Sequence, residues 1–230
     1  MSSKRIRLWD LPTRLFHWLL VAAVAAAVVC GQLGGNLIVW HGRIGLFVVG
    51  LIAFRIVWGV LGSTYARFIH FLPTPARVFA YLRGEWREPG HNPLGALSVF
   101  AMIAVVGFQA VSGLFANDDI AFQGPLYDLV GQDASNRLTS LHHLAGNLLY
   151  VLVGLHVAAI AFYRFVKKDN LVWPMFTGRK EVTHGEDAQG GGLMAFAVAL
   201  LVAVAAVYGA SGAWLPAPPP PPPAAETPNW

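Results

Sequence analysis

The chain has 230 residues, of which 56% are hydrophobic and only 12% are charged. Soluble domains carry about 25% charged residues, so this composition, with a mean hydropathy of +0.54, excludes an ordinary soluble protein and indicates an integral membrane protein. The single cysteine, Cys30, excludes an internal disulfide, a c-type haem attachment and an iron–sulfur cluster. The net charge of +4 fits basic loops facing anionic lipid more simply than it fits nucleic-acid binding.

Five apolar stretches are long enough to cross a bilayer, which takes about 20 residues. In chain order they are expected at 15–33, 39–61, 94–115, 138–165 and 192–214. The first is interpreted as a retained span, because its apolar run continues to Val29 without an A-x-A-like cleavage site. Asp10 and Pro12 predict the start of its helix, since aspartate accepts from free amides and proline suits the first turn.

The connections between the spans differ in charge. They are a glycine turn at 31–35, a basic segment at 62–93 with a predicted amphipathic surface helix at 75–83, an acidic loop at 116–138, and a basic, glycine-rich segment at 164–190. Lys and Arg number four in residues 1–14, four in 62–93 and five in 164–190. Because basic loops stay on the cytoplasmic side, the N-terminus is expected there. Five spans then place the tail 215–230, with the proline run 218–223, in a periplasm.

The fourth span carries three histidines: His142, His143 and His156. Ionisable groups at membrane depth are costly and usually functional. His142 and His156 are 14 residues apart, which at about 100° per residue falls about 40° short of four turns and separates them by about 21 Å along the axis. One face of this helix therefore presents an imidazole near each membrane surface.

Two other spans supply partners at matching depths. His17 lies about one turn inside the first span and His41 at the start of the second, so topology pairs His17 with His156 and His41 with His142. Two imidazoles can hold one b-type haem, and the sequence therefore predicts two haem b groups. A lone histidine near a span end is often only an interfacial residue, but matched depths and a shared face favour a ligand set.

The other histidines are assigned differently. His143 lies about 100° round the helix from His142 and about 140° from His156, so His142 is the expected ligand. His70, His91 and His184 lie in loops and are given no ligand role. His91, in GHNPLG, can still lie near a haem propionate or a quinone on the inner side.

Three further residues are candidates for haem contact. Gly45 and Gly146 each follow a histidine by four residues, which places them one turn deeper on the ligand face, where a macrocycle can approach the backbone. Arg55, 14 residues after His41, shares that face near the inner haem and could pair with a propionate. The alternative is that Arg55 extends towards the cytoplasmic interface.

At these residues the chain resembles the bacterial cytochrome b561 family, which includes the cytochrome b subunits of nickel–iron hydrogenases. The similar segments are WDLPTRLFHW at 9–18, HGRIGL at 41–46, FRIVWGVLGS at 54–63, HNPLGAL at 91–97, LHHLAGNLLYVLVGLHVAA at 141–159 and FYRFVKKDNLVWPMFTGRK at 162–180. The resemblance implies a four-helix transmembrane bundle with two b haems, and carries the ligand role to His17, His41, His142 and His156. It also implies electron exchange between quinone and a partner redox protein. The fifth span and the proline tail depart from the short members of the family.

The expected protein is an all-α integral membrane protein, a four-helix haem-binding bundle plus a fifth C-terminal transmembrane helix. Residues 1–180 form the di-haem domain, 181–214 a linker and the fifth helix, and 215–230 the periplasmic tail. The expected function, in a bacterial inner membrane, is electron transfer between quinone or quinol and a periplasmic c-type cytochrome or hydrogenase-like partner. Two alternatives are a self-contained quinol:superoxide oxidoreductase and a haem-free membrane anchor or transporter.

Overall fold

In a computed structural model, the structure describes residues 3–120 and 122–216. Five helices within these ranges are long and apolar enough to span a membrane. They are α1 (Leu11–Leu33), α2 (Ile38–Leu61), α5 (Pro93–Gly113), α6 (Gln132–Phe165) and α8 (Leu193–Ala210). This confirms the predicted all-α membrane fold. The predicted periplasmic tail lies outside the described residues from position 217 onward.

Short elements connect the long helices. They are the strands β1 (Lys4–Arg7) and β2 (Arg179–Val182), the helices α3 (Phe68–Phe71), α4 (Pro75–Leu82) and α7 (Val172–Thr177), and the single 3-10 turns η1 (Gly35–Leu37), η2 (Thr64–Ala66) and η3 (Tyr127–Leu129). The surface helix predicted at 75–83 is α4. The glycine turn predicted at 31–35 is shorter than expected, because Gly31 belongs to α1 and only Gly34 and Gly35 turn the chain with positive φ.

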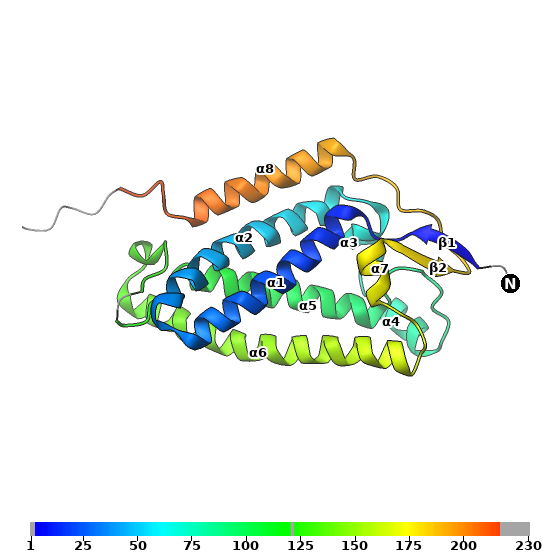
Figure 1. Cartoon of the computed structure of the whole chain (residues 1–230), viewed down its shortest axis with the longest axis horizontal. Coiled ribbons are helices and arrows are strands. Elements are labelled where there is room, and N and C mark those ends of the chain that lie inside the picture. Colours follow the sequence, from blue (N-terminus) through cyan, green and yellow to red (C-terminus); the bar gives the residue numbers. More distant parts are fainter. Residues whose placement is uncertain (1–2, 121, 217–230) are drawn as a thin grey trace, which may run out of the picture.

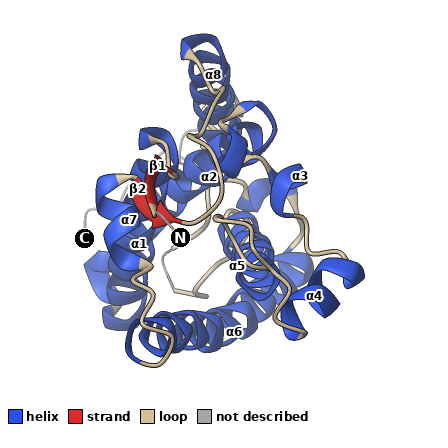
Figure 2. Cartoon of the chain, turned by 90° about the vertical axis from the view of Figure 1, so that its right-hand side faces the viewer, coloured by secondary structure: helices blue, strands red, loops and turns tan. Residues whose placement is uncertain are grey.

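The long helices run side by side and alternate in direction (Figure 1). Helix α2 packs against α1, α5 and α8, and α5 packs against α6. The view along the bundle shows α8 outside the other four, beside α2 (Figure 2). The main core joins four helices through Phe16 of α1, Leu51 of α2, Val106 of α5 and Leu149 of α6. We call the end of the bundle with β1 and β2 the sheet end, and the opposite end, with residues 114–131, the loop end.

Asp10 ties two helices together at the sheet end. One carboxylate oxygen accepts from the backbone N–H of Thr13, at 2.7 Å, and caps α1 as predicted. The other accepts from Trp58 Nε1, at 3.1 Å, and from the Ser63 hydroxyl. Because Trp58 lies in the last turn of α2, the same carboxylate sets the start of α1 against the end of α2.

The basic N-terminal segment contains a strand, β1, that the sequence did not predict. β1 pairs with β2 in an antiparallel register, Lys4 opposite Val182 and Arg7 opposite Arg179. Ile6 within β1 and Leu8 directly after it are buried. The pairing was missed because each strand has only four residues and its partner lies far along the chain, so no local pattern indicates it.

Helix α8 packs closely on α2 through small residues. A Cβ added at Gly50 would lie 2.8 Å from Val207 Cγ2, and Ala199 and Ala203 are buried in the same contact. Small residues let transmembrane helices approach each other. The predicted division of the chain after residue 180 stays a prediction.

Gly50→Leu is expected to push α8 from α2 and destabilise the protein by about 1–3 kcal/mol, the usual cost of overpacking. The haem content is expected to persist, because the histidines lie on other surfaces of the bundle. Thermal unfolding in detergent and the haem spectrum measure the two effects. Gly209→Leu in α8 is the control, because no described atom lies within 4 Å of a Cβ there. Equal destabilisation by both variants would contradict the packing argument.

Candidate haem site

The structure brings the imidazole rings of His41 in α2 and His142 in α6 close together at the loop end. Their ring centroids are 5.9 Å apart and their planes are inclined at 80°. Metal–imidazole bonds are about 2 Å long, so two rings bound to one metal ion have centroids about 6 Å apart. The spacing of this pair therefore fits one haem iron between the two rings.

Hydrogen bonds show which nitrogen of each ring is available. His41 Nδ1 lies 2.8 Å from the carbonyl oxygen of Ala27, which can only accept, so Nδ1 carries the proton. His142 Nδ1 lies 3.2 Å from Ser112 Oγ. Ligating histidines commonly donate from the second ring nitrogen in this way. Nε2 of His41 is therefore left with its lone pair for iron, and an accepting Ser112 hydroxyl would give His142 the same arrangement.

Two glycines beside these rings were not found from the sequence. A Cβ at Gly31 would lie 2.9 Å from His41 Nδ1, and one at Gly113 would lie 3.1 Å from His142 Cε1. Gly31 follows His17 by 14 residues, the spacing that places two residues on one helical face, so a signal for it was present. Gly113 lies in α5, which carries no histidine, so ligand spacing gives no signal for it.

The two predicted contact glycines differ in their surroundings. No described atom lies within 4 Å of a Cβ added at Gly45, whereas one added at Gly146 would lie 3.3 Å from Gln109 Nε2. The surface beside Gly45 is open for a flat ligand, and the surface beside Gly146 is lined by a polar side chain. Their predicted contact with haem stays a prediction.

His17 of α1 and His156 of α6 are the second predicted pair, and both lie towards the sheet end of their helices. Both side chains are half-buried. His17 Nδ1 is enclosed and has no hydrogen-bond partner among the described residues. This ring therefore differs from the two loop-end rings, whose Nδ1 atoms each have a hydrogen-bond partner.

Arg55 is a buried cation of α2 whose guanidinium carbon lies 6.0 Å from the centre of the ring of Phe16, the residue before His17. It is 3% exposed, so it does not extend into solvent at the interface as the alternative requires. One guanidinium nitrogen donates to the carbonyl of Ala66 at 3.1 Å, and the guanidinium carbon lies 4.5 Å from the centre of the Phe68 ring. The guanidinium of Arg55 has five N–H donors, and the carbonyl of Ala66 accepts from only one of its nitrogens. The other donors are left for a carboxylate such as a haem propionate.

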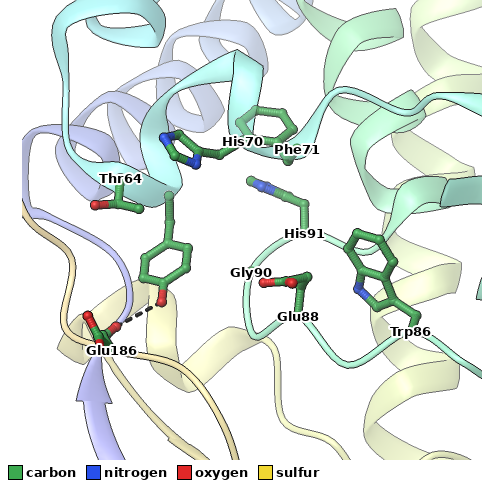
Figure 3. Close-up of a pocket in the computed structure, with 9 residues that line it drawn as sticks. Thr64, His70, Phe71, Trp86, Glu88, Gly90, His91 and Glu186 are labelled. Carbon is green, nitrogen blue, oxygen red and sulfur yellow. Dashed lines mark hydrogen bonds between the residues drawn. The ribbon is translucent and has the colours of Figure 1, made fainter.

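His91 lines a pocket of about 260 Å³ at the sheet end. Its ring lies between Trp9, at 4.7 Å, and Phe71, at 4.6 Å, measured between centroids. Figure 3 shows it pointing into the pocket towards Phe71, with Glu88 and Trp86 nearby. Burial lowers the pKa of His91 to about 3, and the charges of Arg55, His156 and His17 add to the effect. At neutral pH it therefore offers a hydrogen bond and no charge.

The remaining histidines face outward. His143, His70 and His184 are exposed. His143 lies next to His142 in α6 with its ring centroid 6.3 Å away, while His142 is the residue that meets His41. The geometry favours the pairing with His142, and the identity of the iron ligands stays a prediction.

The chain matches the prokaryotic cytochrome b561 family over residues 8–178. It belongs to this family. The match covers α1 to α7 and ends before α8. It is therefore a multi-pass membrane protein of a b-type cytochrome family, and haem b is the cofactor that such a cytochrome carries.

Curated relatives agree with the family. The chain is 24% identical over 213 residues to a protein of Azotobacter chroococcum, a match that covers 75% of this chain and 87% of the relative. It is 24% identical over 212 residues to a protein of Rhodobacter capsulatus, covering 76% and 81%. Both relatives are named "Probable Ni/Fe-hydrogenase B-type cytochrome subunit". No solved structure matches the chain significantly.

Proposed function

We propose that the chain is a di-haem membrane cytochrome that carries electrons between quinone in the bilayer and a redox partner on the periplasmic side. The observation that supports this proposal is the contact of His41 with His142 at one end of the bundle, while His17 and His156 lie towards its other end on α1 and α6. His41 and His142 would hold one haem b, and His17 and His156 the other. Bound there, the haems supply one-electron transfer.

The protein side chains define what kind of redox site this is. Two imidazoles on one iron leave no open coordination position, which opposes binding of oxygen or substrate at the metal. The carbonyl of Ala27 and the hydroxyl of Ser112 orient the loop-end imidazoles. Arg55 supplies a buried positive charge towards the sheet end of α2. These groups would bind the haems, orient their imidazole ligands and adjust their redox potentials. Together they favour electron transfer over catalysis at iron.

The charges of the loops indicate the orientation of the protein in the membrane. The sheet end holds the basic segments 1–14, 62–93 and 164–190, so the positive-inside rule puts this end in the cytoplasm. The loop end, with its acidic segment 116–138, then faces the periplasm. An acidic face suits a basic redox partner, since complementary charge steers encounter. Of the two expected partners, a c-type cytochrome and a hydrogenase, the names of the relatives favour a nickel–iron hydrogenase.

Spectroscopy and a two-substrate assay test the proposal. The purified protein is expected to bind two haem b per chain by pyridine haemochromogen analysis and a reduced-minus-oxidised spectrum. In liposomes, decylubiquinol is expected to reduce both haems, and cytochrome c added on the loop-end side is expected to reoxidise them. Absence of a b-type signal would overturn the haem assignment. Reaction with superoxide as efficient as that with cytochrome c would favour the self-contained quinol:superoxide oxidoreductase.

A further inference from the structure

We propose that Ser112, in α5, sets both the proton position and the ring plane of His142, and thereby tunes the haem at the loop end. The inference rests on the proposed function in one respect, that a haem lies between His41 and His142. Ser112 would not bind the iron. It contacts only Nδ1 of His142, the nitrogen that does not bind iron, so it is a positioning residue.

The hydroxyl of Ser112 has one partner to which it donates and one from which it can accept a hydrogen bond. It donates to the carbonyl of Gln109 at 3.2 Å, a bond back to the preceding helical turn. With that proton committed, Oγ faces His142 Nδ1 as an acceptor, 3.2 Å away. Nδ1 therefore carries the hydrogen, and Nε2 is the unprotonated nitrogen. A hydroxyl that is 1% exposed in an apolar helix has few other partners, so the arrangement is well defined.

The same turn of α5 also determines the plane of the ring. Gly113 lies against the imidazole, since a Cβ there would be 3.1 Å from Cε1. Ser112 fixes one edge of the ring and Gly113 one side of it. On the other side of the pair, the carbonyl of Ala27 holds His41 at Nδ1, 2.8 Å away. Each ring is thus held from a neighbouring helix, and the two planes are kept at 80°.

Two measurable properties follow. A hydrogen bond from Nδ1–H makes the imidazole a stronger donor to iron, which stabilises ferric haem, so loss of the acceptor raises the midpoint potential. Nearly perpendicular imidazole planes give ferric low-spin haem a highly anisotropic EPR signal, whereas parallel planes give a rhombic one. The loop-end haem is therefore expected to show the highly anisotropic signal, and that signal is expected to depend on Ser112.

The test compares three variants in the full-length, haem-loaded protein. Ser112→Ala removes the acceptor, Ser112→Thr keeps a hydroxyl, and Ser98→Ala removes a serine from the other end of the same helix. The haem component lost in His41→Ala identifies the loop-end haem in spectra of the parent. Redox titration and EPR are then recorded for this component in each variant.

Ser112→Ala is expected to raise the potential of this component and to shift its highly anisotropic signal, while Ser112→Thr and Ser98→Ala stay close to the parent. Loss of the component in Ser112→Ala with retention in Ser112→Thr also supports the role of the hydroxyl. An unchanged potential and signal in Ser112→Ala overturns the inference, as does an equal shift in Ser98→Ala. If the parent has no component that His41→Ala removes, the proposed function itself is wrong.

Discussion

His17→Ala and His156→Ala are each expected to remove the same one of two haems, while His41→Ala and His142→Ala remove the other. Each pair spans one end of the bundle, so a single alanine leaves one imidazole facing an iron that has lost its second ligand. Bis-histidine haem b is not covalently attached to the chain, so the weakened site is expected to lose it. Haem per protein and redox titration measure the loss.

Double variants make the pairing explicit. The His17→Ala, His156→Ala double variant is expected to lose no more haem than either single variant, whereas a double variant at His17 and His41 loses both haems. His143→Ala is the matched control, because this exposed neighbour of His142 is turned away from His41. Loss of a haem in His143→Ala but not in His142→Ala would show that the wrong histidine has been assigned.

Arg55→Gln is expected to lower the midpoint potential of the sheet-end haem and to leave the loop-end haem nearly unchanged. A buried positive charge stabilises the electron on reduced haem, and solvent screens it little at 3% exposure. The expected shift is on the order of tens of millivolts, because about 59 mV corresponds to a tenfold change in the equilibrium constant for one electron. Potentiometric titration resolves the two haems.

Two arginine variants test this reading. Arg55→Lys keeps the charge but loses the planar donor geometry, so a smaller shift is expected. Arg43→Gln, on the same helix but exposed beside Trp40 at the loop end, is expected to shift neither potential by a comparable amount. If Arg55→Gln leaves the sheet-end potential unchanged, Arg55 only supports packing against Phe68 and Ala66.

The sequence was a good guide to properties that one helix determines alone. The five spans follow from local hydropathy, and helical period and rise place His142 and His156 on one face at two depths. The start of α1 at Asp10 follows from local capping. The strand pairing of residues 4–7 with 179–182 was missed, because its partner is distant in the chain.

The residues of the candidate site also fall into those that the sequence indicated and those that only the structure shows. The structure brings His41 and His142 together as the pairing predicted, and it shows Arg55 buried rather than extended to solvent. The residues that orient the ligands were missed: Ala27 acts through a backbone carbonyl, which no side-chain pattern reveals, and Ser112 is an ordinary serine in an apolar run. Neither can be distinguished from its neighbours until the helices are packed.

The sequence by itself determined that the chain is a membrane bundle with histidines at two depths, because hydropathy, helical period and loop charge are properties of each segment. Only the tertiary structure decided that α8 packs on α2 through Gly50, that Asp10 joins the start of α1 to the end of α2, and that Ala27 and Ser112 hold the Nδ1 atoms of His41 and His142. These contacts join different helices, so they depend on the rotation and distance of one helix relative to another. The spacing of residues within a single helix does not contain that information.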